Sequence, residues 1–115
     1  LVNGDVELLS QALGNLLANA IGFTPQGGEI ALAAEKRSEE VQLSVIDNGC
    51  GIPDYALERI FERFYSLPRE DGHKSSGLGL AFVREVARLH HGDINLHNRP
   101  EGGVVATLRL HRPFT

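Results

Sequence analysis

A chain of 115 residues and 12.5 kDa fits one small domain. Its 42% hydrophobic and 23% charged residues support a packed core and argue against disorder. The net charge of -4 excludes a generic basic nucleic-acid binder, and no apolar run approaches the roughly 20 residues of a membrane span. Its single cysteine, Cys50, cannot form an internal disulfide, which fits a reducing compartment. Because the chain starts at Leu1 rather than Met, we expect it to be a piece of a longer protein.

The first predicted element is a helix over residues 5–22, with Asp5 as its N-cap and Thr24-Pro25 just beyond its end. Its apolar residues recur with a helical period and form one face: Val6, Leu9, Leu13, Leu16, Leu17 and Ala20. Two strands follow over residues 29–35 and 41–46, joined by a charged turn.

A loop over residues 47–53 leads to a short helix that Asp54 is predicted to cap. Residues 66–76 are polar and predict a mobile surface loop. A second long helix is expected over residues 78–91, with Leu78, Phe82, Val86 and Leu89 buried, and two strands follow over residues 93–97 and 104–110. This order predicts an α+β two-layer sandwich that forms a single domain over residues 1–115.

Two asparagines of the first helix, Asn15 and Asn19, lie one turn apart on a face away from the leucine stripe. An amide oxygen suits Mg²⁺ and an amide nitrogen can donate to a phosphate. For such a pair taken alone, a solvated helix face is the alternative. Only the segments that follow favour a binding role for this pair over a solvated helix face.

Residues 47–53 read Asp-Asn-Gly-Cys-Gly-Ile-Pro and come directly after a strand. A β-hairpin turn is the alternative, but Pro53-Asp54 starts a helix where a return strand would be needed. Gly49 and Gly51 allow the backbone to approach a flat ligand closely. The carboxylate of Asp47 can accept a hydrogen bond from an exocyclic amino group, so the segment predicts an adenine selector.

Residues 75–80, Ser-Ser-Gly-Leu-Gly-Leu, open the second long helix and predict an anion site, because free N–H groups and the positive dipole end meet there. The segment lacks the lysine of a Walker motif and a strand directly before its glycines. The polar loop before it fits a lid over a nucleotide, with positive charge from Arg69, His73 and Lys74, although solvated loop charges are the alternative. Phe61 and Phe64 are predicted to pack beneath this lid.

In chain order, residues 15–20, 47–52, 61–64 and 76–80 resemble the N, G1, F and G2 boxes of the bacterial sensor histidine kinases, and residues 102–107 resemble the G3 box. Residues 65–68 and 108–112 also resemble those of one individual kinase of this family. The resemblance implies the Bergerat ATP-binding fold, with a mixed sheet of about five strands and three helices on one face.

The resemblance also implies roles for single residues. Asp47 would bond the adenine amino group, Asn19 would ligate Mg²⁺, and Asn15 would lie beside the phosphates as the catalytic residue. The remaining residues expected to bind ATP are Phe23, Gly49, Gly51, Ile52, Lys74, Ser75, Ser76, Gly77, Leu78, Gly79, Leu80 and Thr107. The γ-phosphate would pass to a histidine on the kinase's own dimerisation domain, upstream of this chain, and the cognate response regulator would be an indirect partner.

Three positions depart from the family pattern: Gly22 replaces a common lysine, Phe23 a tyrosine, and Ser75 the first G2 glycine. Gly22 leaves a degenerate nucleotide-binding module as one alternative. An ATP-hydrolysing relative of gyrase or Hsp90, which would share the fold, is the other, although such hydrolases resemble one another in carrying a general-base glutamate at the position of Asn15. We expect a monomer that belongs to the cytoplasmic part of an inner-membrane sensor protein. We also expect no self-phosphorylation. Kinases of the family phosphorylate a histidine that is followed closely by a carboxylate, and none of the five histidines of this chain has Asp or Glu directly after it.

Overall fold

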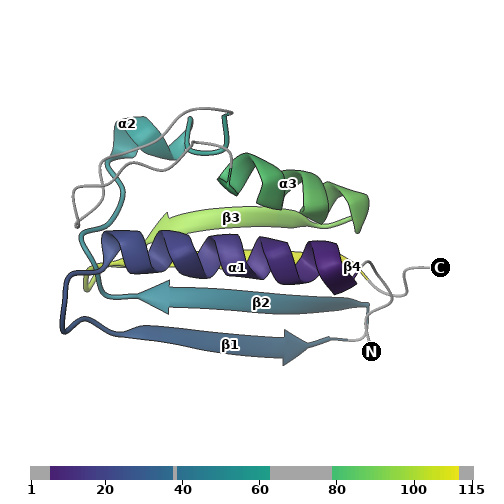
Figure 1. The fold of residues 1–115 in the computed structure, drawn as a ribbon, viewed down its shortest axis with the longest axis horizontal. Coiled ribbons are helices and arrows are strands. Elements are labelled where there is room, and N and C mark those ends of the chain that lie inside the picture. Colours follow the sequence, from purple (N-terminus) through teal and green to yellow (C-terminus); the bar gives the residue numbers. More distant parts are fainter. Residues whose placement is uncertain (1–5, 38, 63–78, 112–115) are drawn as a thin grey trace.

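The computed structural model describes residues 6–37, 39–62 and 79–111, which form a helical layer over one face of a β-sheet (Figure 1). The elements in chain order are α1 (Val6–Phe23), β1 (Ile30–Lys36), β2 (Glu40–Asp47), α2 (Asp54–Leu57), α3 (Gly79–Leu89), β3 (Asp93–Asn98) and β4 (Val104–His111). The predicted α+β two-layer architecture is confirmed. Among the described helices, none has both the length and the apolar character needed to cross a membrane.

The sheet has the strand order β1-β2-β4-β3, and each neighbouring pair is antiparallel. A mixed sheet of about five strands was expected, whereas the described residues form four strands without a parallel pair. The reason lies in the crossover from β2 through α2 and α3 to β3. It joins two strands that run in the same direction, but β4 lies between them and pairs with both.

The core lies between the helices and the covered face of the sheet. Alternate residues of β4 are buried, as a strand with one covered face requires, and α1 packs on β2 while α3 packs on β3 and β4. The largest fully buried side chains come from all of these elements: Leu16, Val45, Val83, Val86 and Leu108. In α1 the predicted stripe is buried at Leu16 and Ala20, while its leucines Leu9, Leu13 and Leu17 are half-buried. Ala12, which was not predicted to face the core, is fully buried.

The buried face of α3 differs from the prediction. Leu89 was expected inside but is 66% exposed, and Phe82 is only half-buried. Val86 is buried as predicted, and the other residues that α3 buries are Leu80, Ala81, Val83 and Ala87. Because α3 contacts α1 as well as the sheet, its buried face is turned away from Phe82 and Leu89 and toward Val83 and Ala87.

The N-cap of α2 differs from the prediction. Asp54 was expected to cap α2, but Pro53 occupies the N-cap position with φ -58° and ψ 144°, and Asp54 is the first helical residue. A carboxylate in a first turn still interacts favourably with the helix dipole. After α3, His91 takes a left-handed conformation with φ 57°.

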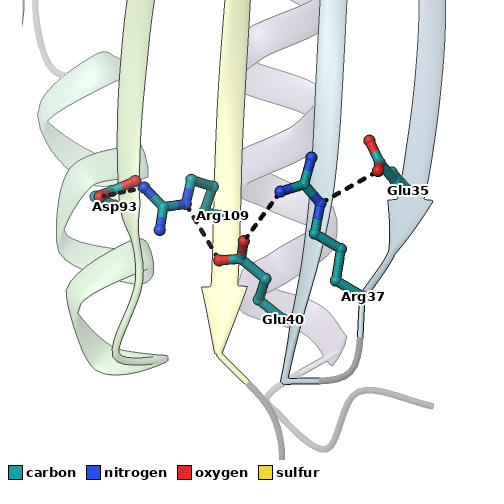
Figure 2. Close-up of polar contacts among 5 residues, drawn as sticks. All are labelled: Glu35, Arg37, Glu40, Asp93 and Arg109. Atoms are coloured by element: carbon teal, nitrogen blue, oxygen red, sulfur yellow. Dashed lines mark hydrogen bonds and ion pairs between the residues drawn. The ribbon is translucent and has the colours of Figure 1, made fainter.

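A row of alternating charges crosses one end of the sheet (Figure 2). Glu40 lies at its centre, 3.2 Å from Arg109 Nε and 3.9 Å from Arg37 Nη1. Arg37 also pairs with Glu35 at 3.1 Å, and Arg109 pairs with Asp93 at 3.4 Å. The row therefore links all four strands at the end where β2 and β3 begin.

Candidate functional site

The candidate site lies at the opposite end of the sheet, where α1 and β2 finish and β4 begins (left in Figure 1). Asp47, the last residue of β2, is 4% exposed. Its Oδ1 accepts hydrogen bonds from the N–H of Gly49 at 2.9 Å and the N–H of Val104 at 3.2 Å. These two bonds fix the carboxylate through one oxygen, and within the described residues Oδ2 is left for another donor.

Two neighbouring cavities meet at this end of the molecule. The smaller, of about 10 Å³, is lined by Leu16, Asn19, Ala20, Phe23, Val45, Asp47, Ile52, Leu96, Val104 and Ala106. The larger, of about 510 Å³, is lined by Phe23, Cys50, Gly51, Ile52, Pro53, Tyr55, Asn98, Arg99, Gly102 and Gly103. Phe23 and Ile52 line both cavities, so these two side chains form the wall between them.

The loop between Asp47 and Pro53 owes its shape to two glycines. At Gly49 a Cβ would overlap the carbonyl oxygen of Phe23, which accepts the N–H of Cys50 at 3.2 Å. Gly51 has φ +80°, a left-handed conformation that side chains disfavour. The close approach at Gly49 is therefore between the loop and the end of α1, and the approach of this loop to a flat ligand stays a prediction.

The two asparagines of α1 lie along the same end of the helical layer. Asn19 lines the small cavity together with Asp47 and Ile52. Asn15, one turn earlier and half-buried, faces the start of α3: a Cβ at Gly79 would lie 3.7 Å from its Cγ. The structure therefore brings both amides, the carboxylate of Asp47 and the N-terminus of α3 to one region, as the motif order predicts.

Other residues expected at the site lie elsewhere. Thr107 is on the face of β4 opposite to Val104 and Ala106, which line the small cavity, so strand alternation directs it away from the site. Leu80 has its side chain in the core and can contribute only backbone. Phe61 is half-buried, and the guanidinium of Arg84 lies 5.8 Å from its ring centroid. Phe64, Lys74, Ser75, Ser76, Gly77 and Leu78 lie outside the described residues.

Asn98 and Arg99 lie between the strands predicted over residues 93–97 and 104–110 and were given no role in the site, yet both side chains bond the loop after β2. Asn98 Oδ1 accepts the N–H of Ile52 at 2.8 Å, and Asn98 Nδ2 donates to the carbonyl of Ile52 at 2.7 Å. Arg99 Nη1 donates to the carbonyl of Asp47 at 2.9 Å. No local pattern signals bonds that join residues 46 and 52 positions apart.

The same turn carries a perturbed carboxylate. Hydrogen bonding to its own backbone N–H, and then the positive charge of Arg99, lowers the pKa of Glu101 below its ordinary value. Glu101 Oε2 lies 3.3 Å from Arg99 Nη2. The guanidinium of Arg99 is therefore shared between Glu101 and the backbone of Asp47.

Comparison with known proteins agrees with this geometry. The family model described as "Histidine kinase-, DNA gyrase B-, and HSP90-like ATPase" matches residues 4–113. Sensor protein CreC of Escherichia coli (strain K12) is 67% identical over 114 residues, covering 99% of this chain and 24% of that protein. CreC is the individual kinase that the sequence resembles. The chain spans about a quarter of the length of the curated relatives it matches.

Solved structures give the same family. The nucleotide-free catalytic domain of histidine kinase ThkA superposes with a TM-score of 0.84 at 33% identity, covering 96% of this chain and 71% of that one. ThkA in complex with the response regulator TrrA gives a TM-score of 0.79 at 31% identity, covering 98% of this chain and 31% of that one. The chain therefore belongs to the histidine kinase, DNA gyrase B and HSP90-like ATPases, as a histidine kinase ATP-binding domain.

Proposed function

We propose that this domain binds Mg-ATP and donates the γ-phosphate to a histidine on the dimerisation domain of the same kinase. The observation that carries the proposal is the buried carboxylate of Asp47, fixed through Oδ1 and beside a cavity that Asn19 also lines. Its second oxygen can accept the exocyclic amino group of adenine. Guanine has a carbonyl at that position, so the same carboxylate would repel it.

The remaining residues of the region bind the other parts of the nucleotide. Ile52 and Phe23 supply apolar surface for the base, and Asn15 and the start of α3 supply donors for the phosphates. In the transfer, the bond from the γ-phosphorus to the bridging oxygen breaks as a bond to the acceptor imidazole nitrogen forms, and ADP leaves. Positioning and neutralisation of charge would supply most of the catalysis.

The donor set of the site fits one magnesium ion that is bound mainly through phosphate. Within the described residues, no group of three or more His, Cys, Asp or Glu side chains could hold a metal ion. Mg²⁺ accepts few protein ligands and keeps phosphate oxygens and water around it, so the amide oxygen of Asn19 suffices as a protein ligand. When bound, the ion would neutralise charge on the phosphates.

Transfer to a partner is favoured over hydrolysis by the residue at position 15. Hydrolysis needs a general base near the attacking water, and an amide cannot accept a proton. Asn15 is the side chain that approaches Gly79 at the start of α3, where phosphates would bind. A degenerate module that binds nucleotide without transfer is the second candidate, because Gly22 leaves the common lysine of the family absent.

We also propose the partners and setting of the domain. The neighbour ThkA was solved with the response regulator TrrA, which supports a cognate response regulator for this kinase as well. The high identity to a protein named as a sensor supports a sensor protein that carries this domain on its cytoplasmic side. The phosphoacceptor histidine would lie in another part of that protein.

A phosphotransfer assay tests the proposal. The chain is first titrated with Mg-ATP and then incubated with γ-labelled ATP, alone and with the phosphoacceptor segment of its kinase added in trans. Label on the added segment only is the expected result. Binding without transfer would favour the degenerate module, and free labelled phosphate without protein label would favour hydrolysis. Acid-labile label on this chain alone would contradict the assignment of the acceptor to another domain.

A further inference from the structure

The loop that carries the adenine-selecting carboxylate is held at both ends by one turn. Asn98 is the last residue of β3 and Arg99 follows it in the turn to β4. The two side chains reach across to Ile52 and Asp47, which bound the loop over residues 47–52. Neither residue belongs to the boxes that the family resemblance identifies.

Asn98 satisfies both backbone groups of Ile52 with one side-chain amide. Its Oδ1 accepts at 2.8 Å and its Nδ2 donates at 2.7 Å, which is the pairing that a neighbouring strand would give. A Cβ at Gly51 would lie 3.0 Å from the same Oδ1, so the amide is also packed against the loop. Since a reversed amide would place like groups together at both bonds, the orientation of Asn98 is fixed.

Arg99 fixes the other end of the loop. Its Nη1 donates to the carbonyl of Asp47 at 2.9 Å, and its side chain is 25% exposed. The carboxylate of Asp47 is held separately, by the N–H groups of Gly49 and Val104. The backbone that carries the carboxylate and the wall residue Ile52 are therefore both positioned by residues 98 and 99.

We propose that Asn98 and Arg99 are positioning residues for adenine recognition: they hold Asp47 and Ile52 at the separation that a purine with a 6-amino group requires. The proposal rests on the proposed function, ATP binding at Asp47. It predicts that loosening the loop reduces affinity for ATP more than affinity for a purine triphosphate that lacks the amino group. A general loss of packing would weaken the binding of both nucleotides equally.

The test compares Kd for Mg-ATP and for Mg-purine riboside triphosphate in the parent chain and in four variants. Asn98→Ala removes both bonds, Asn98→Asp keeps only the acceptor for the N–H of Ile52, and Arg99→Met removes the bond to Asp47. Asn95→Ala is the matched control, because Asn95 lies on the same strand but on the opposite face from the buried Ile94 and Leu96. Circular dichroism establishes that each variant is folded.

We expect Asn98→Ala and Arg99→Met to raise the Kd for ATP about ten-fold, the effect of one or two lost hydrogen bonds, while the analogue changes about two-fold. Asn98→Asp should raise the Kd for ATP at least as far as Asn98→Ala, because its second oxygen would face the carbonyl of Ile52. Arg99→Met decides the matter if the Asn98 variants do not fold. Unchanged ATP affinity, or equal losses for both nucleotides, would overturn the inference while leaving ATP binding intact. A parent chain that binds neither nucleotide would overturn the proposed function and this inference with it.

Discussion

Replacement of Asp47 by Asn tests the adenine assignment most directly, because it should separate binding from folding. An asparagine keeps one oxygen at the position of Oδ1, where the N–H groups of Gly49 and Val104 donate at 2.9 and 3.2 Å. Its amide nitrogen then takes the place of Oδ2. A donor would meet the amino group of adenine, itself a donor, while the fold keeps both internal bonds.

The expected magnitudes follow from these contacts. Loss of a hydrogen bond to a charged acceptor costs about 1.5–3 kcal/mol, so Asp47→Asn should weaken ATP binding roughly 10- to 150-fold. Its free energy of unfolding should change by less than about 1 kcal/mol, since no buried N–H loses its partner. Asp47→Ala leaves two N–H groups without an acceptor at a site that is 4% exposed, and should cost about 2–4 kcal/mol of stability as well.

Calorimetric titration with Mg-ATP and urea denaturation of the parent and both variants provide the measurement. Asp47→Asn should show the large change in Kd and Asp47→Ala a change in both quantities. If Asp47→Asn binds ATP as tightly as the parent, the carboxylate does not select adenine. If it unfolds like Asp47→Ala, the hydrogen bonds at Oδ1 are not those that the structure shows.

Three further outcomes are expected. Asn19→Ala should abolish the strengthening of ATP binding by Mg²⁺, measured by titration with and without the ion, while unfolding changes little; an unaltered Mg²⁺ dependence would exclude Asn19 as a ligand. Glu40→Gln should lower the free energy of unfolding by about 1 kcal/mol at low salt and by less at 1 M NaCl, because it interrupts the charged row. Glu62→Gln, in an exposed ion pair with Arg59 beyond the end of α2, should have no measurable effect. NMR titration should place the pKa of Glu101 below its ordinary value, and Arg99→Met should raise that pKa. A lowered pKa stabilises the fold only while the carboxylate is charged. The stability that Glu101 contributes is therefore present at neutral pH and is lost as the pH falls through its folded-state pKa. A Glu101 titration at the ordinary value would contradict the Arg99 contact.

The local sequence was sufficient for the elements and for the order of the motifs. The helix predicted over residues 5–22 and the strand predicted over residues 104–110 appear in the structure as α1 and β4, because each prediction depends only on the residues of its own segment. The glycines of residues 47–51 predicted a close approach of the backbone to a ligand, whereas the close contact that the structure shows at Gly49 is with the carbonyl oxygen of Phe23. The family assignment followed from the order of such segments along nearly the whole chain.

The tertiary structure decided which face of each element is buried and what lies across the site. A helix with several apolar rows can bury any of them, so only the packing of α3 on α1 and the sheet turns Leu89 outward and buries Val83 and Ala87. Alternation in β4 separates Thr107 from Val104 but does not say which face the helices cover. The bonds of Asn98 to Ile52 depend on the antiparallel packing of distant strands, which no window of sequence contains.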